Sequence, residues 1–354
     1  MFDFKKNRSI CDRSLPMKMK PLDEIAKINL PMCEMYLESE EDTLEKTARR
    51  RTSSVNTLSR PSKSKMFEDF EDSCYPVIEF GRVLGSGGFG QVFEAKCAGR
   101  KVAVKQLTLK SKLRNANAPA ESLRAESLLL EYSHRNLVEI LAVLNSDSVE
   151  ECLIVMEFAG ERNLQTIIDD ECTPLPEKRR IRIALDIASG LEFMHEQGLA
   201  HLDIKPANVI VNSEFDCKIC DFGCCQYVEF GDTKDFQPPS PTNSSLAGTY
   251  TYRAPELLKG EFPTTKADIY SLGICLWQLY VREQPYGMES HFVIIFGVVQ
   301  KNLRPQFPTD IVNDTTNAMY VNLTSSLWHA EGSQRPAASE LVRTLKNWPV
   351  TLKR

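Results

Sequence analysis

The sequence predicts an α+β protein with two lobes, a strand-rich lobe followed by a mainly helical one. Between residues 75 and 160, short segments rich in Val, Phe and Ile alternate apolar and polar residues, as antiparallel strands do. After Gly160, apolar residues recur at spacings of three and four, which indicates helices. A strand-rich half before a helix-rich half favours two lobes with a cleft between them, where ligands commonly bind.

Composition limits the classes of function. A chain of 354 residues suits one large two-lobed domain and a tail, and its net charge of −5 gives no support for nucleic-acid binding. No apolar run reaches the roughly 18 residues of a membrane span, and the N-terminus lacks the apolar core of a secretory signal. Eleven scattered cysteines suit free thiols in a reducing compartment. We therefore predict a cytoplasmic protein.

The chain divides into four regions. An acidic run and then a basic, Ser-rich run, with little apolar periodicity, predict a largely disordered tail over residues 1–74. We expect the strand-rich lobe, an antiparallel sheet with one regulatory helix, over residues 75–159. The helical lobe is expected over residues 160–347, and residues 348–354 form a short C-terminal end.

The first strands contain a glycine-rich segment with the pattern G-x-G-x-x-G. In dinucleotide-binding domains such glycines open a helix, but here the residues after Gly90 continue the alternation of a strand. The pattern therefore predicts a hairpin whose bare backbone approaches the phosphates of a nucleotide. A plain glycine-rich turn is the alternative if no partner motif follows. The segment consists of Gly85, Ser86, Gly87, Gly88, Phe89 and Gly90.

Lys105 lies inside an apolar strand, which is unusual for a charged residue. A buried ammonium group is costly unless a carboxylate or a phosphate pairs with it. The helix expected over residues 119–132 offers three glutamates. We select Glu126 as the partner because a run of three leucines soon follows it, which suits a helix packed towards the cleft. Glu121 is the alternative.

Further elements follow from the same patterns. Residues 137–144 and 152–160 predict two more strands, and residues 180–197 show the apolar spacing of an amphipathic helix.

The stretch HLDIKPANV, residues 201–209, is followed by Asp221-Phe222-Gly223. Asp203 has the position of a group that orients an acceptor hydroxyl and accepts its proton. Asn208 and Asp221 have the positions of ligands for Mg²⁺ ions that bridge the phosphates of ATP. Each residue alone could be a cap or a turn residue, but their order together with the glycine-rich segment and Lys105 makes coincidence improbable. We predict ATP and Mg²⁺ as cofactors of a phosphoryl transfer.

From about Tyr75 to Leu345, these motifs together resemble a eukaryotic protein kinase. The resemblance implies that Glu256, in Ala-Pro-Glu, pairs with Arg335. It also implies that Asp268, on a buried helix, binds and fixes the catalytic loop, residues 201–209. It also implies a Ser/Thr kinase, because Lys205 resembles the lysine that contacts the γ-phosphate in that class. Thr249 would then bridge Asp203 and Lys205.

The resemblance also implies the lining of an adenine pocket. Leu84 and Val92 would cover the ring, Ala103 would line its roof, and Met156 would be the gatekeeper. The purine would bond to backbone groups of Glu157 and Phe158.

Leu202 occupies the position where kinases commonly carry an Arg that pairs with a phosphorylated residue of the activation loop. An apolar Leu cannot form that charge-assisted pair. Our hypothesis is an enzyme that is active without phosphorylation of this loop.

Leu202 also narrows the resemblance to the Mos family. Residues 1–74, however, do not resemble the N-terminal segment of the vertebrate members of that family. The segments CKICDFGC, GTYTYRAPELLKGE and TKADIYSLGICLWQ agree with it. The resemblance implies a MAP kinase kinase kinase, whose protein partner is a MAP kinase kinase, acting in oocyte meiotic maturation and metaphase arrest. A kinase of another pathway, such as a Raf-like one, is the alternative. A pseudokinase scaffold is disfavoured, because Lys105, Asp203, Asn208 and Asp221 are intact.

Overall fold

The structure of the chain is a computed structural model that describes residues 77–87, 90–107, 118–144, 152–228 and 250–349. The expected tail of residues 1–74 lies outside the described residues, and so do Gly88, Phe89 and Thr249. From Ile78 onward, the described residues belong to one compact unit.

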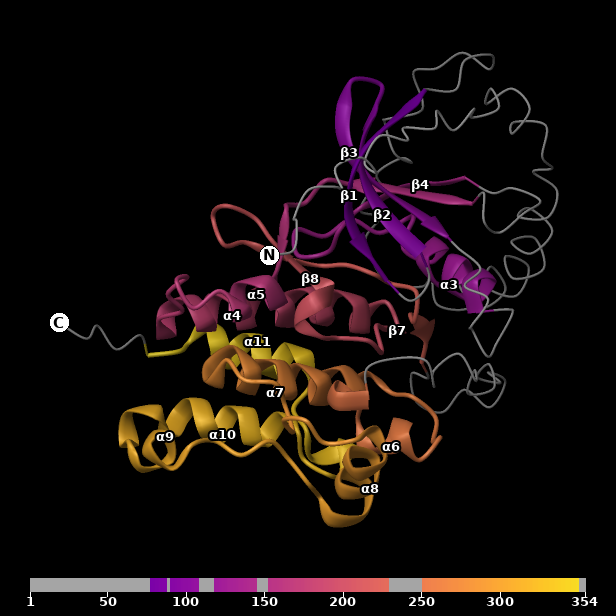
Figure 1. Ribbon diagram of the computed structural model, residues 1–354. Coiled ribbons are helices and arrows are strands. Elements are labelled where there is room, and N and C mark those ends of the chain that lie inside the picture. The colour runs from indigo at the N-terminus through magenta and orange to yellow at the C-terminus, as the bar shows by residue number, and fades with distance from the viewer. Residues whose placement is uncertain (1–76, 88–89, 108–117, 145–151, 229–249, 350–354) are drawn as a thin grey trace, which may run out of the picture. The chain divides into compact units, whose positions relative to one another are not determined.

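The first lobe is built on a five-stranded antiparallel sheet in the order β1-β2-β3-β5-β4 (Figure 1). One helix, α3, follows the third strand. The predicted α+β class is therefore confirmed. The elements are β1 (Ile78–Ser86), β2 (Gly90–Cys97), β3 (Arg100–Leu107), α3 (Ala118–Ser127), β4 (Ile140–Leu144) and β5 (Leu153–Glu157).

Strand β3 separates two apolar clusters because its side chains alternate between the faces of the sheet. Val102 and Val104 belong to a small cluster on one face. Ala103 belongs to the main core on the other face, and the alternation directs Lys105 to that same face. The sequence pattern of β3 therefore turns Lys105 towards the core that is shared with the second lobe.

Helix α3 is shorter than the sequence predicted. We expected it to run to residue 132, but it ends at Ser127 and the chain continues in turns. The Ser127 hydroxyl donates to the Leu123 carbonyl at 2.8 Å, and the Leu128 amide bonds the Ala125 carbonyl, three residues back. Such hydroxyl bonds and tightened turns compete with regular α-helix.

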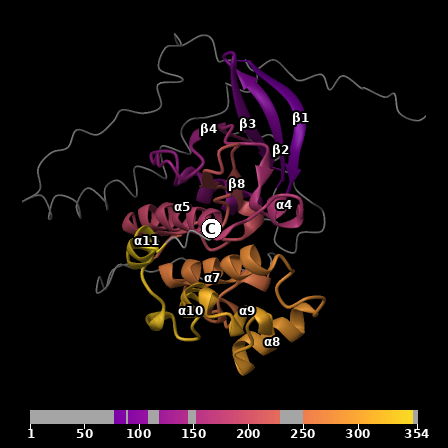
Figure 2. The same cartoon turned by 90° about the vertical axis from the view of Figure 1, so that its left-hand side faces the viewer.

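The second lobe is mainly helical, as predicted, and helices α5, α7 and α10 stack in that order (Figures 1 and 2). Its elements are β6 (Arg162–Asn163), α4 (Leu164–Asp169), α5 (Glu177–Glu196), β7 (Leu199–Ala200), η2 (Pro206–Asn208), β8 (Val209–Val211), β9 (Cys217–Ile219), β10 (Gln226–Tyr227), η4 (Tyr250–Tyr252), α6 (Pro255–Leu258), α7 (Thr265–Val281), α8 (His291–Lys301), α9 (Thr309–Asn313), η5 (Thr315–Asn317), α10 (Ala318–Leu327), η6 (Gly332–Gln334) and α11 (Ala338–Lys346).

Helix α7 is buried on nearly all of its faces, from Ala267 to Leu279, because α5 and α10 pack on it. A helix that is apolar all round belongs in the interior of a protein or in a membrane. Within the described ranges, no helix has both the length and the apolar character needed to cross a bilayer.

Candidate active site

Lys105 joins three elements of the candidate site. Its Nζ lies 2.5 Å from Oε1 of Glu126, on α3, and 2.6 Å from Oδ1 of Asp221, which follows β9. The pairing expected between Lys105 and Glu126 is therefore present. Of the alternative partner, Glu121, the Oε2 atom is buried and has no hydrogen-bond partner among the described residues.

The electrostatics of this cluster follow from burial and from its single cation. Burial alone would lower the pKa of Lys105, but the carboxylates of Asp221 and Glu126 reverse this and raise it far above its usual value. Burial raises the pKa of Glu126, and Lys105 offsets only part of the rise. Burial would also raise the pKa of Asp221, but there Lys105 prevails and the pKa is lowered. Asp221 is therefore ionised at neutral pH.

Close packing of α3 on the Asp221 segment holds this cluster together. A Cβ added at Gly223 would lie 2.4 Å from Oγ of Ser122, on α3, so only glycine permits this approach. Phe222 is buried, with its ring edge-on to His201 at a centroid distance of 5.6 Å. Ser122 and His201 are contributors that the sequence did not identify.

The catalytic loop brings its predicted residues together. Lys205 Nζ lies 2.6 Å from Oδ2 of Asp203. Nδ2 of Asn208 donates to the carbonyl oxygen and to Oδ2 of Asp203, both at 2.9 Å. The loop forms here because Pro206 starts the short helix η2, where its missing N–H leaves no bond unmade. The backbone of Asn208 in turn accepts the Cys220 amide at 2.9 Å, which places it next to Asp221.

Asp268, on α7, anchors the start of the loop as the resemblance implied. Its carboxylate accepts the amides of His201 at 2.8 Å and Leu202 at 2.7 Å, and it lies 2.9 Å from Nε2 of His195. Leu202 has left-handed backbone geometry, with φ of 63°, which is unfavourable for a side chain of this size. The bonds to Asp268 hold it there, while its side chain packs against the main core.

The glycine-rich hairpin leaves room beside the sheet. Gly90 is required by packing, because a Cβ there would lie 2.0 Å from the Gln106 carbonyl oxygen. A Cβ at Gly85 or Gly87 would meet no heavy atom of the described chain within 4 Å. These two glycines therefore leave open space of the kind that a nucleotide would need.

The side chains expected around adenine lie close to the main core. Met156 is buried and pairs with Ala103 across the β3–β5 register. Leu84 and Val92 are partly buried against the same core.

The strand end at Glu157 constrains how a purine could bond. The Glu157 amide already donates to the Glu139 carbonyl at 3.0 Å, so Glu157 has only its carbonyl to offer. A backbone donor for the purine would then come from a residue other than Glu157, and Phe158 is the one that the resemblance implied.

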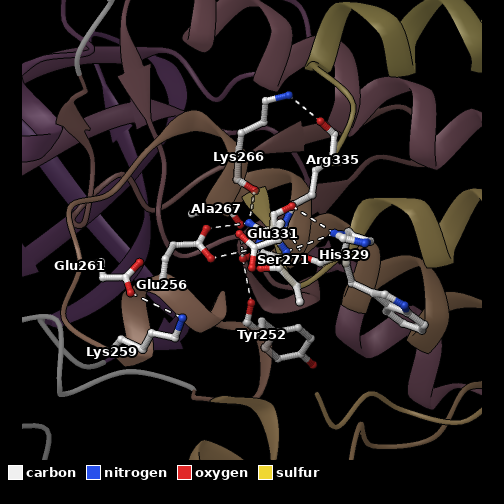
Figure 3. A network of polar contacts seen from close by, with 12 residues as sticks. Tyr252, Glu256, Lys259, Glu261, Lys266, Ala267, Ser271, His329, Glu331 and Arg335 are labelled. Carbon is white, nitrogen blue, oxygen red and sulfur yellow. Dashed lines mark hydrogen bonds and ion pairs between the residues drawn. The ribbon is translucent and has the colours of Figure 1, made fainter. Parts of the chain in front are cut away.

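A network of polar contacts fixes the chain after residue 249 (Figure 3). Arg335 binds Glu256 through both terminal nitrogens, at 2.6 and 2.9 Å, and it is 1% exposed. It also donates to the carbonyls of His329 and Lys266. Beside it, the Ser271 hydroxyl donates to the Tyr252 carbonyl at 2.8 Å. The pairing of Glu256 with Arg335 implied by the resemblance is therefore present.

The residues near Asp221 fit a hard divalent cation. Because both amide hydrogens of Asn208 are directed to Asp203, its side-chain oxygen is left as an acceptor. Asp221 supplies an ionised carboxylate beside it. Carboxylate and amide oxygens are the donors that Mg²⁺ prefers.

Comparison with known proteins agrees with this geometry. The family model described as "Protein kinase domain" matches residues 78–345. The serine/threonine-protein kinase mos of Patiria pectinifera is 45% identical over 281 residues, which cover 77% of each chain. The proto-oncogene serine/threonine-protein kinase mos of Mus musculus is 39% identical over 276 residues, 74% of this chain and 78% of the relative. That of Rattus norvegicus is 38% identical over 288 residues, 76% and 82% respectively.

The fold and the site therefore define a protein kinase, an enzyme that acts on proteins and uses ATP with a divalent metal. Within that class, the chain belongs to the Mos-like serine/threonine kinases.

Proposed function

We propose that this kinase activates a MAP kinase kinase by transferring the γ-phosphoryl group of ATP to its Ser or Thr hydroxyls. The observation that carries the catalytic part is the position of Lys105, within 2.6 Å of both Glu126 and Asp221. This arrangement sets an ammonium group beside a metal-binding carboxylate, where the phosphates of ATP are bound in kinases.

On the acceptor side, we assign the chemistry to the catalytic loop. Asp203 would orient the acceptor hydroxyl and accept its proton, a role suited to a carboxylate that is only partly exposed. Lys205, held against Asp203, would balance negative charge as it develops on the transferred group. Asn208 would keep Asp203 in place through its two amide bonds.

On the nucleotide side, Lys105 would bind the phosphates, and Glu126 would keep its ammonium group in position. Asn208 and Asp221 would hold the Mg²⁺ ions. When bound, these ions neutralise phosphate charge as the phosphoryl group is transferred. The binding surface we propose comprises Leu84, Gly85, Ser86, Gly87, Gly88, Phe89, Gly90, Val92, Ala103, Met156 and the backbone at Glu157 and Phe158.

The pathway is proposed from the similarity to the mos kinases and includes a role in oocyte meiotic maturation and metaphase arrest. A cytoplasmic location belongs to the same proposal. It is supported by cysteines that are free among the described residues, such as Cys152 and Cys275. A kinase of another pathway remains the competing function, whereas a scaffold without activity would not need the charge cluster at Lys105.

The decisive experiment supplies the purified protein with ATP, Mg²⁺ and kinase-dead MAP kinase kinase. We expect phosphate on Ser of the substrate, and a loss of about 100-fold or more in rate for Asp203→Asn, because a proton acceptor contributes that much. Lys259→Met, which removes an exposed ion pair with Glu261 outside the proposed site, should keep the parent rate. Equal rates for Asp203→Asn and the parent would refute the enzyme. Phosphorylation of other proteins but never of this substrate would refute the pathway.

A further inference from the structure

An ion pair joins the end of β5 to β9. Nζ of Lys218 lies 2.5 Å from Oε1 of Glu157, and both side chains are 28% exposed. Lys218 is on β9, just before Asp221, and Glu157 ends the strand that leads past the proposed adenine pocket. The pair therefore joins a segment on the metal side of the site to a segment on the base side.

The segment of residues 136–139 runs between these two strands and is bonded to both. Towards β5, Oε1 of Glu157 accepts the Glu139 amide at 2.9 Å, and the Glu157 amide bonds the Glu139 carbonyl. Towards β9, Lys218 donates to the Leu137 carbonyl at 3.4 Å. The Val138 amide also bonds the Ile219 carbonyl at 2.8 Å. Glu157 and Lys218 thus belong to a network of several bonds and not to an isolated surface pair.

We propose that Lys218 and Glu157 are positioning residues that hold the base-binding strand end and the Asp221 segment at a fixed spacing. This inference rests on the proposed function. A nucleotide that contacts both segments binds more tightly when they are already in place, because it does not have to order them. The pair thereby sets the affinity for ATP more than the rate of the chemical step.

The test uses the full chain and measures both turnover and the affinity for a fluorescent ATP analogue. Lys218→Met removes the cation, and Glu157→Gln removes the anion while it keeps an oxygen for the Glu139 amide. We expect each to raise KM for ATP and Kd for the analogue about three- to fivefold, the upper part of the range for a solvent-accessible ion pair, with kcat changed less than twofold. The double variant should be no worse than the weaker-binding single variant, because the two residues act through one contact.

Two controls separate positioning from general stability. Lys218→Arg, which keeps the charge, should stay within about twofold of the parent KM, and Lys259→Met should leave both constants unchanged. Unchanged KM and Kd in Lys218→Met would overturn the proposal, and so would effects that multiply in the double variant or a fall in kcat alone. The analogue Kd does not require catalysis, so failure of the proposed function, read from Asp203→Asn, is distinguished from failure of the pair.

Discussion

The carboxylate of Glu126 has its charge balanced by the ammonium group of Lys105. It is 1% exposed, and its companion Lys105 is 6% exposed. Breaking a buried pair by removing one member leaves an uncompensated charge, which costs about 3–5 kcal/mol. We therefore predict that Lys105→Met lowers the free energy of unfolding by about this amount at neutral pH, measured by urea unfolding without nucleotide.

The cost should depend on pH. Burial raises the pKa of Glu126 above its ordinary value of 4.5, and the loss of Lys105 would raise it further. The folded variant then binds a proton that the unfolded chain releases, so its stability falls as pH rises above about 5. The deficit relative to the parent should be smallest near pH 5 and largest near pH 7.5. Lys105→Met/Glu126→Leu removes the more deeply buried of the two carboxylates that Lys105 pairs with and leaves only Asp221, whose side chain is 33% exposed, so it should recover part of the deficit. An equal deficit at both pH values would contradict this account.

At this scale the sequence predicted which residues meet, but not always for the right reason. Glu126 was selected because leucines follow it, yet those leucines lie beyond the end of α3. Charge alone predicted that a carboxylate would pair with the buried Lys105, but it did not decide between Glu126 and the alternative Glu121. The contact of Ser122 with Gly223 could not be predicted, because it depends on how closely two distant segments pack.

Helix α7 acts on the catalytic loop through Asp268. The two carboxylate oxygens accept the amides of His201 and Leu202, and Asp268 is fully buried. In Asp268→Asn an NH₂ group replaces one acceptor and faces an amide donor, and a buried unmet donor costs about 1–3 kcal/mol. We predict reduced stability by this amount, at least a tenfold fall in kcat, and faster hydrogen exchange at the amides of His201 and Leu202.

Hydrogen exchange provides the specific readout for this helix–loop contact. A variant that lost activity while these two amides kept their protection would show that Asp268 acts in another way.

Element positions were predictable where a single chain pattern carries the information. The amphipathic spacing of residues 180–197 identified α5, but the helix begins earlier, at Glu177. The spacing missed this first turn because the turn carries charged residues and gives no apolar signal. The apolar sequence of α7 predicts a buried helix, but it does not predict where the helix lies or how it is oriented, since an apolar helix can pack in many orientations. Only the resemblance to kinases indicated that Asp268 would bind the catalytic loop.

In the structure as a whole, the charge cluster of Lys105, Glu126 and Asp221 is already formed. Lys105 contacts Glu126, Phe222 is buried, and Leu202 packs on the core instead of offering a cation to a phosphate. We predict that bacterially expressed, phosphatase-treated protein keeps the turnover of the untreated protein within about twofold. The reason is that the apolar side chain of Leu202 cannot form a charge-assisted hydrogen bond with a phosphate. The measurement is substrate phosphorylation, with Asp203→Asn treated in parallel as the background.

The outcome that would contradict this prediction is specific. Activity would vanish on dephosphorylation and return when a Ser or Thr within residues 233–249, which lie outside the described residues, is replaced by Asp.

The Glu256–Arg335 pair has a consequence for the order of folding. Its partners are 79 residues apart, so the pair closes a long loop, and the entropy of that closure must be lost before the contact forms. Contacts of such separation form late when shorter-range packing, such as that of neighbouring helices, is available first. We expect the pair to be absent from the folding transition state, so that its loss accelerates unfolding and leaves the rate of folding nearly unchanged.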